Sequence, residues 1–273
     1  MNSAEAQKQQ DERVAATVSK IKHKVIILSG KGGVGKSTVS VNVAYSLAEQ
    51  GKKVGLLDVD IHGPSIAKMV GIEGEAILGS KDGYPKPIKV NENLYAITMA
   101  SFTSSPDEPI IWRGPLKMAM IKQFLSDIDW PELDYLIIDS PPGTGDEPLS
   151  VVQIIGNVDG AIIVSTPQDV ALLDARKTIK FSQKMNVPIL GIVENMSTFI
   201  CPHCGEAIDI FKGLGVQKAA KDYNIDILGN IPLDPDVVAA GDRGTAFVSK
   251  FKESAGAQVY KQISAQITKK IEL

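Results

Sequence analysis

The chain contains few cysteines and no long apolar segment. Its 273 residues include only Cys201 and Cys204, whereas a disulfide framework in a secreted domain needs more cysteines at wider spacing. The longest apolar runs, such as 25–28 and 135–138, are far short of the roughly 20 residues of a membrane span. Residues 1–20 are polar and lack an apolar signal-peptide core. These absences predict a cytoplasmic protein whose cysteines are metal ligands or redox thiols.

Basic residues are not in excess either. The chain has 29 Lys and Arg against 32 Asp and Glu, a net charge of −3. This balance gives no electrostatic attraction to a polyphosphate backbone, so we expect no nucleic acid partner. An expected helix over 255–271 carries a narrow apolar stripe without Trp or Phe. We therefore expect it to pack on the protein's own core, and we expect no membrane partner.

Strand-like apolar runs alternate with helical patterns from Lys24 onward. A strand over 25–29, a helix over 36–50 and a strand over 54–58 form a βαβ unit, which implies parallel pairing. The pattern becomes irregular over 72–101, which predicts a hairpin-like insertion that contains the segment 94–99. The later expected elements are helix 116–128, strand 135–139, helix 149–155, strand 161–165, helix 170–185, strand 189–194, helix 215–223, strand 226–231 and helix 255–271.

The composition of these strands indicates the fold class. They are continuous apolar runs rather than alternating ones, as expected for a sheet that is covered on both faces. We predict a doubly wound α/β fold with a mostly parallel sheet and helices on both faces. It forms one domain over 21–273, preceded by a mobile polar tail over 1–20.

A phosphate-binding motif lies between the first strand and the first helix. Gly30 to Ser37 fits G-x-x-x-x-G-K-[ST] in the strand–loop–helix context that the motif requires. Backbone N–H groups and the helix N-terminus would face the phosphates. Lys36 would reach the β- and γ-phosphates, and the Ser37 hydroxyl would bind magnesium. The motif predicts a site for ATP and Mg²⁺ made of Gly30, Gly32, Gly33, Val34, Gly35, Lys36, Ser37 and Thr38.

Acidic residues follow two further strands, at the edge where open α/β sheets bind ligands. Asp139 ends an apolar strand and could hold magnesium through a water. Asp58 and Asp60 follow the strand over 54–57. Both Asp139 and Asp60 could instead cap helices. Gly143 lies in the segment P-P-G-T-G-D, which fits a switch loop that senses the γ-phosphate.

The two cysteines form a C-P-H-C-G turn that can present two thiolates to one metal centre. Zinc and iron-sulfur sites both commonly use four thiolates, and the spacing leaves the two open. One chain supplies two thiolates and two chains supply four. Metal binding would therefore require a symmetric homodimer with the site on its axis.

The phosphate loop also contains a second lysine, Lys31. Its form, G-K-G-G-V-G-K-S-T, resembles the deviant Walker A motif of the MinD, ParA and nitrogenase iron protein superfamily, whose members dimerise face to face over ATP. This resemblance implies that Lys31 reaches the nucleotide of the other subunit and that Asp60 positions or activates the attacking water. It implies an ATPase with Lys31, Lys36 and Asp60 as catalytic residues.

Several motifs together resemble the Mrp/ApbC-type iron-sulfur cluster carriers. They are the phosphate loop, D-V-D-I-H-G-P-S from Asp58, D-S-P-P-G-T-G-D-E from Asp139, E-N-M-S from Glu194 with the cysteine turn, and I-P-L-D-P from Ile231. The resemblance implies that Cys201 and Cys204 of two subunits hold a bridging [4Fe-4S] cluster. It also implies that Asn195, Pro232 and Asp234 line the adenine pocket.

By the same resemblance, donor proteins would supply the cluster or its sulfur, and apo iron-sulfur proteins would receive the cluster. Two alternatives remain at this point. The cysteine turn could be a zinc staple in a dimeric ATPase switch, since zinc accepts the same thiolates. The chain could also be a MinD/ParA-like positioning ATPase that acts on DNA, a membrane or a protein partner.

Overall fold

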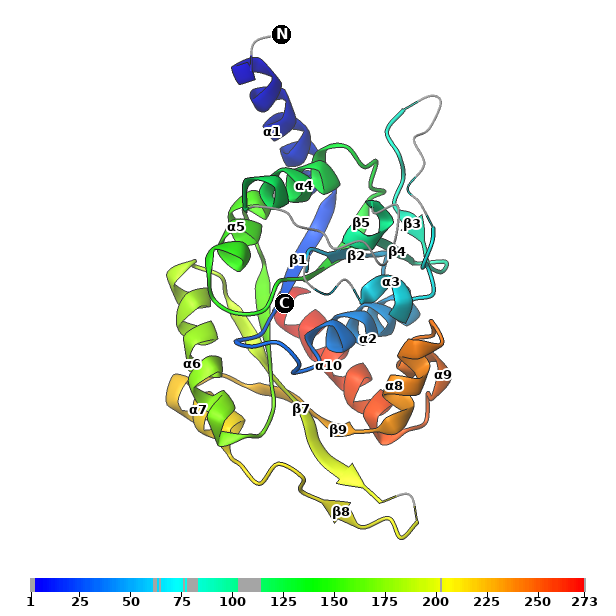
Figure 1. Cartoon of the computed structure of the whole chain (residues 1–273), viewed down its shortest axis with the longest axis vertical. Coiled ribbons are helices and arrows are strands. Elements are labelled where there is room, and N and C mark those ends of the chain that lie inside the picture. The colour runs from blue at the N-terminus through cyan, green and yellow to red at the C-terminus, as the bar shows by residue number, and fades with distance from the viewer. Residues whose placement is uncertain are drawn as a thin grey trace.

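The computed structural model describes residues 3–60, 63, 65–75, 77, 83–102, 114–201 and 203–272. Within these residues the strands form one nine-stranded sheet in the order β3-β4-β2-β5-β1-β6-β7-β8, with β9 paired to β7 (Figure 1). The strands are β1 Ile21–Leu28, β2 Val54–Asp58, β3 Ile88–Lys89, β4 Leu94–Thr98, β5 Leu133–Asp139, β6 Gly160–Ser165, β7 Ile189–Ile200, β8 Ala207–Ile208 and β9 Ile227–Leu233.

Pairing is parallel except at two places. β3 pairs antiparallel with β4, and β8 pairs antiparallel with the end of β7. The first of these confirms the hairpin-like segment expected within 72–101. Its second strand, β4, also joins the main sheet in parallel with β2.

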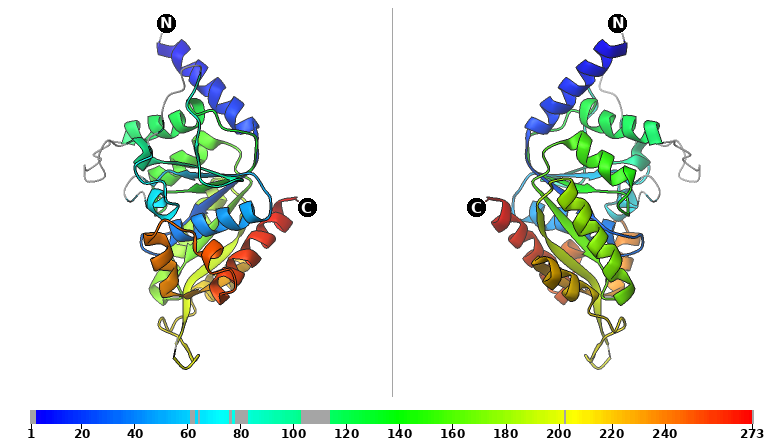
Figure 2. Two further views of the ribbon diagram at one scale, coloured as in Figure 1. Left: turned by 90° about the vertical axis from the view of Figure 1, so that its right-hand side faces the viewer. Right: turned by 90° about the vertical axis from the view of Figure 1, so that its left-hand side faces the viewer.

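Helices cover both faces of the sheet (Figure 2). The helices that follow β1 in the chain are α2 Lys36–Glu49, α3 Ile66–Met69, α4 Gly114–Ser126, α5 Asp146–Ile155, α6 Asp169–Lys184, α7 Gly215–Tyr223, α8 Pro235–Asp242, α9 Phe247–Lys250 and α10 Ala255–Glu272. Among the described helices, none has the length and apolar character needed to cross a membrane.

The buried side chains of β1 show why the sheet has two covered faces. Val25 and Ile27 belong to the core cluster shared with α2 and α10, whereas Ile26 and Leu28 belong to the cluster shared with α4 and α5. Successive side chains of a strand point to opposite faces, so an unbroken apolar run fills two cores at once. The predicted doubly wound α/β class is confirmed.

The N-terminal segment differs from the predicted mobile tail. Residues Ser3–Ser19 form a helix, α1, and its C-terminal half packs against α4 and the start of β1. Val14 is buried in the same core cluster as residues of α4, and Lys122 on α4 bonds Asp11 at 2.8 Å. The apolar contact residues, Val14 and Val18, lie four positions apart on one helical face. This stripe is too short to stand out in a polar sequence.

Two other features extend beyond the sequence prediction. β7 continues to Ile200, six residues past its expected end, because its last residues pair with β8. The short helix α8 was not predicted, although its start has a recognisable signal. Asp234 caps it by accepting a hydrogen bond from the Asp236 N–H, and Pro235 occupies the first turn, as both residue types prefer.

Candidate functional site

The phosphate loop lies at the carboxyl end of β1 and leads into α2. Gly33 and Gly35 have φ values of 77° and 83°, in the left-handed region that favours glycine. A Cβ on Gly35 would lie 2.1 Å from Nδ2 of Asn195, and one on Gly30 would lie 2.5 Å from the Asp174 carbonyl oxygen. Conformation thus favours glycine at position 33, space requires it at position 30, and both reasons apply at position 35.

Strand register brings three polar side chains together beside this loop. Asp58, the last residue of β2, is paired with Asp139 at the end of β5 and with Thr98 at the end of β4. The carboxyl ends of these parallel strands meet at one edge of the sheet, and Asp60 lies two residues after the end of β2. The acidic residues predicted from strand ends thus share one site.

Lys36 neutralises this acidic cluster. Its Nζ lies 2.9 Å from Oδ1 of Asp139 and 3.4 Å from Oδ2 of Asp60, and its side chain is only 6% exposed. Burial alone would lower the pKa of Lys36, but the charges of Asp139, Asp60 and Asp58 outweigh it and hold that pKa above its usual value. The ammonium group stays charged where phosphate oxygens would approach.

The residues predicted to hold magnesium are in contact. The Ser37 hydroxyl donates to Oδ2 of Asp139 at 2.6 Å, and the Ser40 hydroxyl donates to Oδ1 at 2.7 Å. Hydroxyl and carboxylate oxygens are the hard donors that Mg²⁺ prefers, and it keeps several waters when bound. The donor set therefore fits a magnesium ion held by Ser37 directly and by Asp139 through water. Ser40, one helical turn after Lys36, was not predicted.

Asp58 has a role that the sequence did not reveal. Its carboxylate accepts from the Thr98 hydroxyl at 2.9 Å and from the Asp60 backbone N–H at 3.1 Å, and it has no exposed surface. Burial, reinforced by the negative charge of Asp139, raises the pKa of Asp58 well above its usual value. Asp58 thus fixes the backbone of Asp60 at an energetic cost.

Lys31 in the phosphate loop and Gly143 in the expected switch loop each make a hydrogen bond to another segment. Lys31 is half-buried and its Nζ donates to Oε1 of Gln168 at 3.3 Å. Gly143, with a φ of 94°, donates its N–H to the carbonyl of Ser29 at 2.8 Å. The expected switch loop is therefore hydrogen-bonded to the residue that precedes the phosphate loop. Gly32 and Gly33 are exposed, whereas Thr38 is half-buried at the start of α2.

The three residues expected to line an adenine pocket lie in different surroundings. Asn195 is buried, and its Nδ2 donates to the Val34 carbonyl at 2.9 Å. Pro232 lies in β9, and Asp234 caps α8. The structure thus brings Asn195 to the phosphate loop and gives Asp234 a capping role. The adenine contacts stay a prediction.

The cysteine turn closes the β7–β8 hairpin. The N–H of Cys201 donates to the Glu206 carbonyl and the N–H of Gly205 to the Cys201 carbonyl, both at 2.9 Å. Gly205 has a left-handed φ of 72°. Hydrogen bonds from the backbone N–H groups of Cys204 and His203 and from the Cys204 thiol lower the pKa of Cys201. Pro202 lies outside the described residues.

These contacts favour the thiolate, the form that binds metal. Over the described parts of the chain, no group of three or more His, Cys, Asp or Glu side chains could hold a metal ion. Cys204 and His203 are exposed, and Cys201 is half-exposed. One chain thus offers an accessible pair of sulfur ligands, too few for a four-thiolate site.

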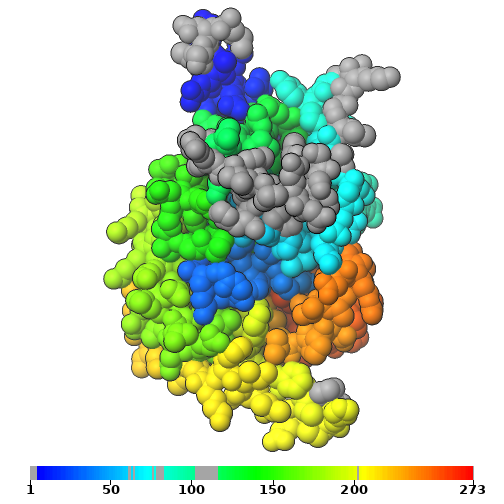
Figure 3. Space-filling view, viewed as in Figure 1, coloured from blue at the N-terminus to red at the C-terminus, as the bar shows by residue number. Residues whose placement is uncertain are grey.

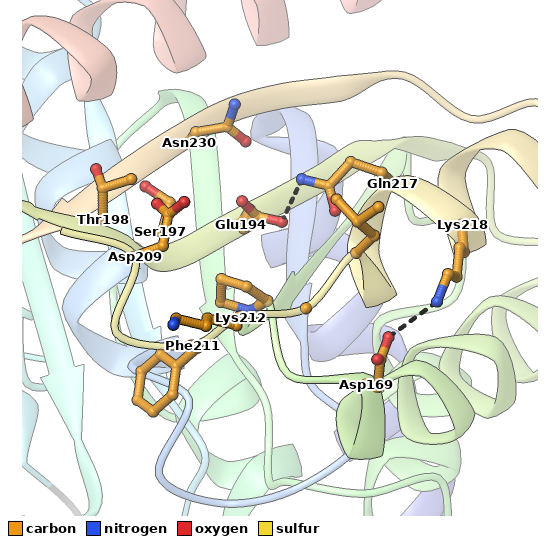
Figure 4. Close-up of a pocket in the computed structure, with 13 residues that line it drawn as sticks. Asp169, Glu194, Ser197, Thr198, Asp209, Phe211, Lys212, Gln217, Lys218 and Asn230 are labelled. Carbon is orange, nitrogen blue, oxygen red and sulfur yellow. Dashed lines mark hydrogen bonds and ion pairs between the residues drawn. The ribbon is translucent and has the colours of Figure 1, made fainter. Parts of the chain in front are cut away.

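A cavity of about 680 Å³ lies along the base of this hairpin (Figure 4). Glu194 of β7 lines it, and its carboxylate accepts from Nε2 of Gln217 at 2.8 Å. Burial raises the pKa of Glu194, with the hydrogen bond from Gln217 opposing it. The hairpin and the loop after it contribute Ser197, Thr198, Asp209, Phe211, Lys212, Gly213 and Leu214.

Comparison with known proteins relates the chain to a family. The pattern of the family described as NUBPL iron-transfer P-loop NTPase matches residues 20–268. An iron-sulfur cluster carrier protein of Methanocaldococcus jannaschii is 47% identical over 264 residues, covering 97% of this chain and 90% of the relative. One of Methanococcus maripaludis is 46% identical over 241 residues, covering 88% of this chain and 83% of the relative.

The chain is also similar to solved structures of nucleotide-binding proteins and ATPases. A nucleotide-binding protein from Archaeoglobus fulgidus in complex with ADP, in which cobalt was found, is 38% identical, with a TM-score of 0.77 over 88% of this chain and 93% of that one. The cell division ATPase MinD of Pyrococcus furiosus is 23% identical, with a TM-score of 0.66 over 91% of this chain and 99% of that one. The latter likeness shows the fold alone.

Substitution of Asp58 tests the strained acidic cluster. A carboxylate whose pKa is raised on folding stabilises the fold below its unfolded pKa and loses that contribution as pH rises through its folded pKa. At neutral pH, Asp58→Asn should therefore increase the free energy of unfolding by about 1 kcal/mol, the scale of a single stabilising substitution. Urea denaturation of nucleotide-free protein at several pH values measures this.

Asp134→Asn serves as the matched control. Its carboxylate accepts from Lys22, and this hydrogen bond lowers the pKa of Asp134, so its contribution is present above the unfolded pKa and is lost in acid. At neutral pH, Asp134→Asn should leave the free energy of unfolding unchanged or decrease it. A loss of neutral stability in Asp58→Asn would contradict the strained-cluster interpretation.

Proposed function

Since this chain belongs to the family of NUBPL iron-transfer P-loop NTPases, we propose that it is an ATP-hydrolysing iron-sulfur cluster carrier. In this proposal two copies hold one [4Fe-4S] cluster between them and pass it to apo iron-sulfur proteins. The observation that carries the proposal is the exposed hairpin that presents Cys201 and Cys204, which no third His, Cys, Asp or Glu ligand joins among the residues that the structure describes. The relatives named as cluster carriers support it.

The nucleotide chemistry rests on the acidic cluster and the phosphate loop. Lys36 is held charged between Asp139 and Asp60, so its ammonium can exchange carboxylate partners for the β- and γ-phosphates. Magnesium, when bound, neutralises charge on the phosphate oxygens. Asp60 lies beside Lys36 and would orient the attacking water. Lys31 would leave Gln168 to reach the nucleotide of a second copy.

Apolar residues around the cysteines support association of two copies. Ile200, Ile208 and Ile210 are each 46% exposed on the hairpin and the residues that follow it. Two hairpins that meet around a two-fold axis would bury such residues while completing a shell of four thiolates. Figure 3 shows the phosphate-loop surface (blue) and the hairpin surface (yellow) on one face of the molecule. A single face-to-face dimer could therefore serve both sites.

A zinc staple is the competing use of the same thiolates. Structural zinc sites are closed and stable, whereas a carrier must release its metal. The exposure of His203 and Cys204 on the hairpin tip favours a site from which cargo can leave. Loading and release of iron distinguish the two.

Asp60→Asn tests the hydrolytic role. Losing the carboxylate should slow ATP hydrolysis by about 10²-fold or more, the range of a positioned acid or base, because the water would no longer be oriented. ADP should still bind, since Lys36 and the loop amides are intact. Steady-state turnover and ADP titration measure the two effects, and Lys36→Ala, which should lose both, is the comparison. Unreduced turnover in Asp60→Asn would refute the assignment.

Cys201→Ala and Cys204→Ala test the cluster site. Each substitution removes two of the four thiolates in a symmetric dimer, so neither variant should retain a stable cluster or transfer one to an apo iron-sulfur enzyme. Anaerobic reconstitution followed by visible absorbance and activation of the recipient measures this. His203→Ala, in the same exposed turn, should load and transfer normally. Tightly held zinc in the wild type, with no uptake of iron, would exclude the carrier function.

A further inference from the structure

A single strand, β7, touches both candidate sites. It contacts the phosphate loop at Asn195 and reaches Cys201 six residues later. The nucleotide and cysteine sites are otherwise formed by different parts of the sheet. Any movement of the phosphate loop that displaces Asn195 is therefore applied to the strand that ends one residue before the first cysteine.

The contact at the phosphate loop is close. Asn195 is 6% exposed and donates from Nδ2 to the Val34 carbonyl at 2.9 Å. A Cβ on Gly35 would lie 2.1 Å from the same nitrogen and 3.8 Å from Cε of Met196. The Asn195 amide thus contacts the loop backbone directly, and the end of the Met196 side chain lies nearby. A shift of the Val34 carbonyl would break this hydrogen bond unless Asn195 moves with it.

The strand has an irregular backbone just beyond this contact. Met196 has a φ of 56°, a left-handed value that is rare for a residue other than glycine and costs of order 1–3 kcal/mol. Asn195 pairs with Ile231 and Phe199 with Leu233, so four steps along β7 match two along β9. This bulge interrupts the regular ladder between the phosphate loop and the hairpin.

The hairpin beyond the bulge has space beside it. Its base, at Ser197, Thr198 and Asp209, borders the cavity of about 680 Å³ (Figure 4). In Figure 1 the end of β7 and β8 extend away from the helices. The base of the hairpin is held to β9 by the Phe199–Leu233 pair and by the hydrogen bond from the Ser197 hydroxyl to the Ile231 carbonyl, whereas Ile200 and Ile208 beyond it are each 46% exposed. A change in the direction of the hairpin would therefore involve the residues beyond these contacts.

We infer that Asn195 is a positioning residue that transmits the state of the phosphate loop through Met196 to the cysteine hairpin. This inference rests on the proposed carrier function and deepens it by assigning a route between the two sites. When phosphates bind, the Val34 carbonyl moves with the loop, Asn195 follows its hydrogen bond, and the bulge at Met196 converts the shift into a new hairpin orientation. If nucleotide binding changes the affinity of the cysteines for their ligand by some factor, then by linkage binding of that ligand must change the affinity for nucleotide by the same factor.

Hydrogen exchange on cluster-free protein tests this route. The amide of Cys201 is bonded within the hairpin, as is that of Gly205. In the wild type, saturating Mg-ADP should change the exchange rate of the peptide over 197–208 by threefold or more. Asn195→Ala should abolish that change at saturating Mg-ADP, where altered affinity has no influence. Asn230→Ala, on β9 beside Glu194, is the matched control and should respond as the wild type does.

Met196→Gly is the second variant, and it remains informative if Asn195→Ala does not fold. Glycine adopts the left-handed φ without strain, so the hairpin should be looser and its response to Mg-ADP at least halved. A full response in both variants, or no response in a wild type that binds ADP, would overturn the inference. If Mg-ADP changes hydrogen exchange in the wild-type hairpin but the protein never takes up iron, the carrier function is excluded. The link from the phosphate loop through Asn195 to the hairpin would still hold.

Discussion

A lysine ammonium buried among carboxylates organises the carboxyl edge of the sheet. Lys36 contacts Asp139 from β5 and Asp60 from the segment after β2, and Asp58 lies behind them without any exposed surface. Three carboxylates so close together would repel one another in a medium of low dielectric constant. The lysine compensates for this repulsion, and it does so at the position where phosphate oxygens bind in a P-loop NTPase. The carboxylates of the site thus repel one another in the nucleotide-free protein. A bound polyphosphate with magnesium would change which charges Lys36 and the carboxylates contact.

The second constraint is the number of thiolates. The hairpin holds Cys201 in a set of backbone hydrogen bonds that favour its thiolate, yet a chain offers two sulfur ligands where a cubane cluster commonly takes four. In the proposed function a symmetric pair of chains would resolve the shortage, and the exposed isoleucines around the cysteines would give that pairing an apolar surface. Because β7 connects this hairpin to the phosphate loop through Asn195, the dimer, the nucleotide and the cluster would be coupled through one strand.

The sequence predicted the fold and the phosphate loop well because both depend on local patterns. Continuous apolar runs such as 25–28 mark strands buried on both faces, and the glycines and Lys36 mark the loop. Other features depend on contacts between distant segments. The α1 helix packs through a short apolar stripe that includes Val14, and β7 is lengthened by its pairing with β8. The raised pKa of Asp58 reflects burial and the strand register that places its carboxylate beside that of Asp139. Asn195 was noted as a site residue, but its hydrogen bond to Val34 could come only from the folded chain.

In the proposed carrier two chains share one cluster, and native mass spectrometry of the anaerobically reconstituted protein measures that directly. We expect a dimer whose mass exceeds two chains by four irons and four sulfides, about the content of one [4Fe-4S] centre held by four cysteines. Addition of an iron chelator should return the protein to two bare chains. A monomer that carries the metal, or a dimer with a single zinc ion that the chelator does not remove, would contradict the account.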